Sequence, residues 1–220
     1  MLLWECIAGV GSKASFSADL PNGFVTQSAV FESTDLPLEC LALLPSGQGS
    51  LGLISDLTAQ PALSTDRGVG LFLNDPFLNI TQVAQLLDAH KIGWITNLPS
   101  IAQHEELFRR DLADVGILME TELARLAEFR HRGVRTLAAI STIEHAGMLS
   151  RYPADAVVVL QTTDELQVSF PSFAKRQVVY TEIRNFLEQE GDEVCVMPIL
   201  AASEKADFSG PALLRPEMLS

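Results

Sequence analysis

The sequence predicts a single α/β domain built as a compact (β/α)8 barrel, the TIM-barrel architecture. Short apolar runs alternate along the chain with segments of helical periodicity, which is the pattern of repeated β/α units around a parallel sheet. The chain has 220 residues, and barrels of this kind rarely have fewer than about 200. We therefore expect one domain over residues 1–220, with incomplete or irregular closure of the barrel at its C-terminal end.

Seven segments are predicted to be buried strands, because they are short, apolar and bounded by turn residues. Seven strands with six connections favour a barrel over an open sheet. The tail after residue 201, which contains Pro211 and Pro216, shows no eighth strand. The predicted strands span residues 2–10, 24–31, 69–73, 92–96, 134–140, 156–160 and 194–200.

Helices are expected in the connections between these strands. Apolar residues recur at helical spacing over residues 79–91. The long tract over 104–132 is predicted to form two helices that separate at Val115, and Gly133 is expected to end the second one. Three further helices are predicted over residues 51–59, 142–152 and 171–190.

The charge balance limits the classes of partner. With 15 basic and 28 acidic residues the net charge is −13, and such a field repels nucleic acid and anionic membranes. A small anionic substrate stays possible, because a helix N-terminus can bind phosphate inside an acidic protein.

The cysteines and the hydropathy pattern predict a soluble cytoplasmic protein. Cys6, Cys40 and Cys195 are widely spaced and odd in number, which favours buried thiols in a reducing compartment. The sequence shows no export signal and no uncharged apolar run of about 18 residues. Because the chain is apolar and barrel closure looks weak, we also expect a homo-oligomer.

Candidate site residues are those that follow the predicted strands, since β/α barrels carry their sites at the C-terminal strand ends. Gly9-Val10-Gly11 forms either a tight turn or half of a phosphate-binding loop. The strand-end positions are Gly9, Gly11, Ser12, Lys13, Glu32, Asp35, Asn74, Asp75, Asn97, Ser100, Ser141, Thr142, Gln161, Thr162 and Thr163.

Three acidic residues leave alternatives open. Asp75, which precedes Pro76, is either a general base or metal ligand, or the cap of a turn. Glu120 and Glu122 would point about 200° apart on a regular helix. Either both interact favourably with the helix dipole or one of them reaches the site.

The pair Arg109-Arg110 is expected on a solvated helix face.

The order of several motifs resembles the phosphoenolpyruvate hydrolase-like TIM-barrel family, which is distantly similar to phosphoenolpyruvate mutase and isocitrate lyase barrels. The resemblance covers roughly residues 5–165. It is carried by Gly9-Val10-Gly11, Leu41-Ala42-Leu43-Leu44-Pro45-Ser46-Gly47, Asp75-Pro76-Phe77, Asn97-Leu98-Pro99-Ser100, Phe108-Arg109, Met119-Glu120-Thr121-Glu122, Arg125-Leu126-Ala127 and Pro153-Ala154-Asp155-Ala156-Val157-Val158-Val159.

The resemblance implies lyase or hydrolase chemistry on a small phosphorylated or carboxylated keto or enol acid, with Mg²⁺ as a candidate cofactor and often an oligomeric assembly. Asp75 would be the catalytic base or metal ligand. The substrate-binding candidates would be Gly9, Gly11, Ser12, Lys13, Asn74, Asn97, Ser100, Glu120 and Gln161.

The chain also departs from this family's pattern. An arginine-containing signature is replaced by residues 28–32, the expected lysine falls at Ser15, and the histidine-containing strand ends are replaced by residues 159–163 and 198–200. These losses remove anion-binding and proton-transfer groups. The alternative to an enzyme is therefore a catalytically degenerate barrel that acts as a binding or regulatory module.

Overall fold

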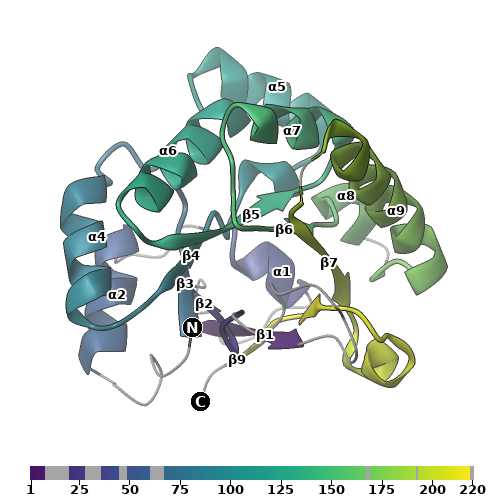
Figure 1. Ribbon diagram of the computed structural model, residues 1–220, viewed down its shortest axis with the longest axis horizontal. Helices are drawn as coiled ribbons and strands as arrows, with labels where there is room; N and C mark the ends of the chain where they lie inside the picture. The colour runs from purple at the N-terminus through teal and green to yellow at the C-terminus, as the bar shows by residue number, and fades with distance from the viewer. Residues whose placement is uncertain are drawn as a thin grey trace.

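The computed structural model describes residues 1–7, 20–27, 36–44, 49–59, 67–166, 169–191 and 193–218. Their strands form a single sheet that curls into a closed ring (Figure 1). The order around the ring is β2-β3-β4-β5-β6-β7-β8-β1, and the pairing of β1 with β2 closes it. The strands are β1 (Leu2–Ile7), β2 (Gly23–Thr26), β3 (Arg67–Gly70), β4 (Trp94–Thr96), β5 (Arg135–Ile140), β6 (Ala156–Val159), β7 (Cys195–Leu200), β8 (Ala212–Leu214) and β9 (Glu217–Met218).

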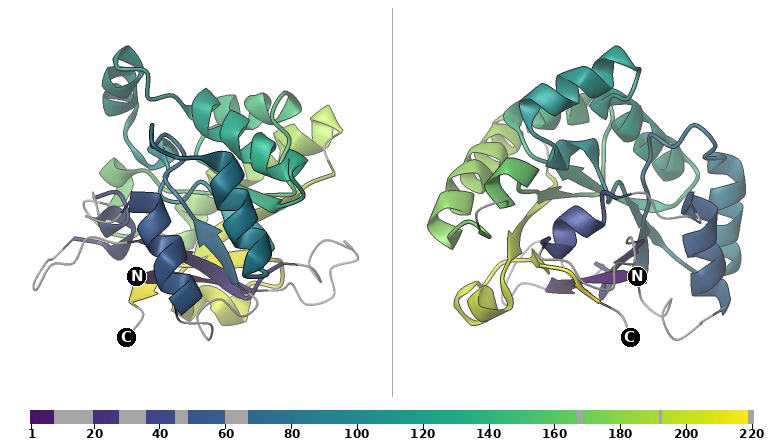
Figure 2. Two further views of the ribbon diagram at one scale, coloured as in Figure 1. Left: turned by 90° about the vertical axis from the view of Figure 1, so that its left-hand side faces the viewer. Right: turned by 180° about the vertical axis from the view of Figure 1, so that it is seen from behind.

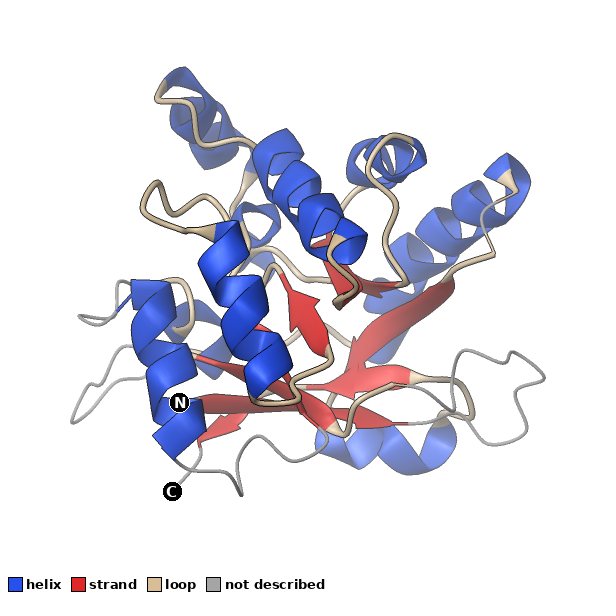
Figure 3. Cartoon of the chain, turned by 60° about the vertical axis from the view of Figure 1, so that its left-hand side comes forward, coloured by secondary structure: helices blue, strands red, loops and turns tan. Residues whose placement is uncertain are grey.

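Helices cover the outside of the ring, as Figure 3 shows with helices in blue and strands in red. For example, α6 packs on β4 and β5, and α9 packs on β6 and β7. The helices are α1 (Leu38–Leu41), α2 (Gly49–Ala59), α4 (Ile80–Ala89), α5 (Glu106–Asp114), α6 (Met119–His131), α7 (Ile143–Gly147), α8 (Thr163–Leu166) and α9 (Phe173–Glu190), with 3-10 turns η2 (Ile101–Gln103), η3 (Met148–Ser150) and η4 (Ala202–Asp207). Within the described residues, no helix is long and apolar enough to cross a membrane.

The predicted α/β barrel is thus confirmed, and so are the helices expected over 79–91, 104–132 and 171–190. The long tract does separate into α5 and α6, and Gly133 follows α6 with a left-handed φ of 85°. The short helix α1 was not predicted. It lies within the ring of strands in Figure 1 and in the rear view of Figure 2.

The direction of β1 differs from the regular barrel that the sequence predicts. β2 to β7 are each parallel to the next strand, whereas β1 is antiparallel to both β2 and β8. The chain therefore leaves β1 at the opposite end of the barrel from the end where β2 to β7 finish. The sequence could not reveal this, because a buried strand has the same apolar pattern in either direction.

The tail supplies the strand that the sequence did not show. β8 joins β7 to β1 and so completes the barrel. Beyond it, β9 pairs with the first residues of β1, and the register shifts by one residue between Cys6↔Leu213 and Leu3↔Glu217, which is a bulge. A strand of three residues between two prolines is too short for a recognisable pattern.

Aromatic side chains fill the barrel where β2 to β4 begin. Phe24 and Trp94 meet edge to face, with ring centroids 6.4 Å apart. A Cβ on Gly68 would lie 2.5 Å from the Phe24 ring and 2.9 Å from Trp94, so only glycine fits between them. This end of the barrel is closed by core packing, which leaves the opposite end for a site.

Candidate functional site

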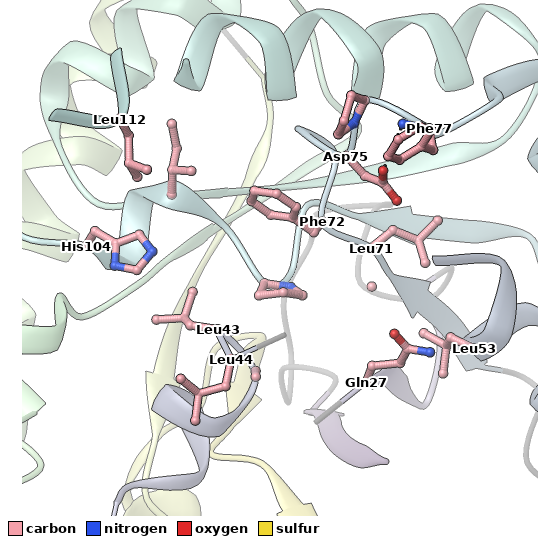
Figure 4. Close-up of a pocket in the computed structure, with 15 residues that line it drawn as sticks. Gln27, Leu43, Leu44, Leu53, Leu71, Phe72, Asp75, Phe77, His104 and Leu112 are labelled. Atoms are coloured by element: carbon pink, nitrogen blue, oxygen red, sulfur yellow. Dashed lines mark hydrogen bonds between the residues drawn. The ribbon is translucent and has the colours of Figure 1, made fainter. Parts of the chain in front are cut away.

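A cavity of about 410 Å³ lies at the carboxyl ends of β2, β3 and β4. Gln27 follows β2 and Pro99 follows β4. The segment after β3 contributes residues 71–72 and 75–77. The turn after α1 closes another side, and the close-up in Figure 4 shows Leu43 and Leu44 below the residues from the β3 segment. This is the end at which β/α barrels carry their sites.

The cavity wall is mostly apolar. Its polar side chains are Gln27, Asp75 and His104, and no Lys or Arg occurs among the described residues that line it. Ligand sites typically combine an apolar wall with a few placed polar groups. The lining consists of Gln27, Ala42, Leu43, Leu44, Leu53, Gly70, Leu71, Phe72, Asp75, Pro76, Phe77, Pro99, Ile101, His104 and Leu112.

A buried ion pair fixes α1 beside the cavity. Glu39 of α1 is 3% exposed, and its carboxylate accepts hydrogen bonds from both Nε and Nη2 of Arg215, the latter at 3.0 Å. Arg215 follows β8 and also packs on the ring of Phe170, 4.2 Å from the ring centroid. Gln103 Nε2 donates to the Glu39 carbonyl at 3.4 Å. The tail of the chain therefore positions one wall of the cavity.

Asp75 lies in the cavity wall and caps a turn at the same time. Its Oδ1 accepts a hydrogen bond from the Phe77 amide at 2.9 Å, and Arg125 Nη1 donates to its carbonyl oxygen at 2.7 Å. The turn-capping interpretation of Asp75 therefore holds for one carboxylate oxygen. The side chain is half-buried, and its catalytic role stays a prediction.

His104 faces the cavity from the side away from Asp75, as Figure 4 shows. Burial, and secondly the nearby Arg109 guanidinium, lower the pKa of His104. The imidazole is therefore neutral at pH 7, where it can both donate and accept a hydrogen bond. No sequence pattern singles out His104, because its position depends on how η2 leads into α5.

Three of the predicted site residues converge on Glu122 rather than on the cavity. Asn74 Nδ2 donates to Oε1 at 3.0 Å, Asn97 Nδ2 to Oε2 at 2.9 Å, and Ser100 Oγ to Oε2 at 2.6 Å. The Ile101 amide donates to Oε1 at 3.1 Å. Glu122 is fully buried, so this cluster joins the ends of β3 and β4 to α6.

Burial raises the pKa of Glu122, although all four hydrogen bonds act in the opposite direction. Asn97 makes two further hydrogen bonds: its Nδ2 donates to the Ala139 carbonyl and its Oδ1 accepts from the Ala139 amide. The amide groups of Asn74 and Asn97 are thus occupied within the protein. Their role as substrate-binding residues, like that of Ser100, stays a prediction that these contacts do not favour.

The remaining predicted residues lie elsewhere. Glu120 is exposed and pairs with Arg151 and Tyr152 on the outer surface, both at 2.8–2.9 Å. Its neighbour Glu122 is the one that turns inward, as expected for residues two apart on a helix. Gln161 follows β6 and is 7% exposed.

The four candidates after β1 lie outside the described residues: Gly9, Gly11, Ser12 and Lys13. We expected them at the same end of the barrel as Asp75 because all follow strands. That reason fails, because β1 is antiparallel to its neighbours and ends at Ile7 on the other side of the barrel.

The fold and the cavity define the architecture: a closed β/α barrel with a mostly apolar cavity at the carboxyl ends of β2, β3 and β4. No family model matches the chain, and no curated protein matches it. The resemblance to the phosphoenolpyruvate hydrolase-like family therefore stays a prediction.

Solved structures resemble the chain only weakly. A native KDPGal structure has a TM-score of 0.40 at 14% identity over 76% of this chain and 64% of its own. FabK from Thermotoga maritima has a TM-score of 0.38 at 13% identity over 71% of this chain and 40% of its own. Nitroalkane oxidase from Streptomyces ansochromogenes has a TM-score of 0.40 at 12% identity over 69% of this chain and 48% of its own. The chain thus spans less than two thirds of each of these structures.

Proposed function

We propose that the protein binds a small organic molecule whose apolar part fills the cavity at the carboxyl ends of β2, β3 and β4. The observation that supports this most strongly is the composition of the wall, which is apolar apart from Gln27, Asp75 and His104. The volume of about 410 Å³ lies within the range of roughly 300–1,000 Å³ that is common for ligand pockets.

Calorimetric titration with 1-octanol tests this proposal. Saturable binding is expected, because the alkyl chain of octanol would leave water and contact leucine side chains in the cavity. Leu44→Trp should weaken binding at least tenfold, since the indole would occupy the cavity. Val178→Trp, at an exposed position on α9, is the matched control and should bind as the wild type does. Absence of saturable binding, or equal binding by Leu44→Trp, would contradict the proposal.

A second candidate is the lyase or hydrolase reaction on a phosphorylated or carboxylated keto or enol acid, with Asp75 as general base. It is favoured by the position of Asp75, a carboxylate in the cavity wall that lies in the segment following β3. The described lining gives it less support, because an anionic substrate would meet Asp75 there and no Lys or Arg. If the protein is a catalytically degenerate barrel, it binds its ligand in the cavity and catalyses no such reaction.

The two candidates separate in an assay with phosphoenolpyruvate and oxaloacetate, in which phosphate release and keto-acid formation are followed. If Asp75 is the base, Asp75→Asn should lower turnover by about 10²- to 10⁴-fold while octanol still binds. If Asp75 only caps the turn, the asparagine keeps the cap and only Asp75→Ala should destabilise the protein, by about 0.5–2 kcal/mol.

The Mg²⁺ that the resemblance implies has few ligands available. In the part of the chain that the structure describes, no three His, Cys, Asp or Glu side chains gather as a metal site, and Asp75 is the carboxylate in the described cavity lining. Mg²⁺ needs six oxygen ligands, of which proteins commonly supply one or two carboxylates while waters and substrate phosphates supply the rest. The described lining offers one carboxylate and no preformed metal centre.

A further inference from the structure

Arg109 of α5 faces the barrel mouth instead of the solvated side that its sequence context predicts. Its Nη1 donates to the His104 carbonyl at 3.1 Å and to Ser141 Oγ at 3.3 Å. Leu112, one helical turn further along α5, lines the cavity, and so does His104. Residues at this spacing share one helix face, so the guanidinium lies at the His104 side of the cavity.

Although the protein is acidic, the described partners of the Arg109 guanidinium are a carbonyl and a hydroxyl oxygen and not a carboxylate. Its neighbour Arg110 pairs with Glu106, and most other described basic side chains also meet a carboxylate. No ion pair of Arg109 occurs among the residues that the structure describes. A half-buried guanidinium without a carboxylate retains most of its capacity to bind an anion.

Ser141 and His145 add two further donors beside it. The Ser141 amide donates to His145 Nδ1 at 3.4 Å, so in the neutral imidazole the proton is on Nε2. Ser141 Oγ accepts from Arg109, which leaves its own hydrogen to donate elsewhere. Both side chains are more than nine-tenths buried, and no described residue accepts from the Ser141 hydroxyl or the His145 Nε2–H. The low pKa of His145, about 4, is caused by burial and then by Arg109.

We propose that Arg109, Ser141 and His145 form an anion-binding subsite, and that the ligand is an organic acid whose carboxylate or phosphate binds there while its apolar body fills the cavity. A guanidinium without a described carboxylate partner, together with the Ser141 hydroxyl and the His145 Nε2–H, offers the positive charge and the donors that an anionic oxygen group requires. This placement also separates the anion from Asp75, which lies on the other side of the cavity (Figure 4). The proposal for the organic acid rests on the proposed function; the anion site itself does not.

Calorimetric titrations of the wild type, Arg109→Gln and Arg110→Gln with octanoate, 1-octanol and inorganic phosphate test the proposal. Octanoate should bind the wild type at least tenfold more tightly than octanol, and Arg109→Gln should remove this difference while octanol binding is retained. Octanol binding also shows that the variant is folded. Arg110→Gln removes a neighbouring positive charge from the exposed Glu106 pair and should change nothing.

Each outcome decides one of the two proposals. Equal binding of octanoate and octanol by the wild type, or unchanged octanoate binding by Arg109→Gln, overturns the organic-acid subsite and leaves the cavity proposal intact. If neither eight-carbon compound binds, the cavity proposal fails, and phosphate then decides the anion site alone. Saturable phosphate binding that weakens at least tenfold in Arg109→Gln supports the site, and phosphate binding that is absent or unaltered overturns it.

Discussion

Glu122 illustrates what a single buried carboxylate does in this fold. It receives four hydrogen bonds, two of them from Asn74 and Asn97. We predict that Glu122→Gln destabilises the protein by about 1–3 kcal/mol, because its amide would face at least one of these donors and leave it unpaired. Glu122→Ala should cost more. Urea unfolding measures both, and Glu128→Gln on the exposed face of α6 should stay within about 0.5 kcal/mol.

His145 makes stability depend on pH. Its pKa falls from 6.5 to about 4 in the folded protein, so below pH 6.5 the unfolded chain binds more protons. Stability from this group is therefore lost as pH falls from 6.5 towards 4. Between pH 7 and pH 5 the free energy of unfolding of the wild type should fall by about 2 kcal/mol more than that of His145→Asn. The Oδ1 of the asparagine can replace Nδ1 as the acceptor. If the free energies of unfolding of the two proteins change equally between pH 7 and pH 5, His145 is not the cause of the pH dependence.

Residue positions could be predicted from the sequence better than residue roles. Asn74, Asn97 and Ser100 were selected as neighbours because each follows a strand, and they do lie together. The sequence could not show that the inward-facing Glu122 binds all three. That contact depends on the rotation of α6, and helix rotation is set by tertiary packing.

At the level of elements, the ion pair between Glu39 of α1 and Arg215 after β8 should hold α1 in place beside the cavity. Arg215→Met leaves Glu39 buried and unpaired, which typically costs about 3–5 kcal/mol. The double variant Glu39→Met/Arg215→Met should recover much of this loss, because it removes both charges. Urea unfolding of the two single variants and the double variant gives the coupling energy. Additive effects of the two substitutions would show that the pair does not act as a unit.

The same elements show where sequence reasoning ends. α4, α6 and α9 could be predicted because each has ten or more residues and so spans several helical turns. β8 has three residues and α1 has four, so neither is long enough for its apolar pattern to repeat. Both are stabilised by long-range contacts such as Glu39–Arg215, which no local pattern records.

The assembly of the whole molecule stays a prediction. Several large apolar side chains are exposed on and around α5, including Leu107 at 69% and Val115 at 73%, and the helix itself buries no residue. We expect a homo-oligomer that covers more than about 1,000 Å² of surface per contact. Sedimentation of the wild type should give a mass well above 23.9 kDa, and Leu107→Glu should reduce it. A stable monomer at high concentration would contradict this expectation.

For the whole molecule, methyl NMR during a 1-octanol titration tests directly whether the cavity binds a small molecule. We expect saturable shift changes at the cavity leucines and none at Val178, which is exposed on α9 and does not line the cavity. Unchanged methyl signals throughout the titration, or changes at Val178 without changes at the cavity, would contradict it. The leucines to follow are Leu43, Leu44, Leu53, Leu71 and Leu112.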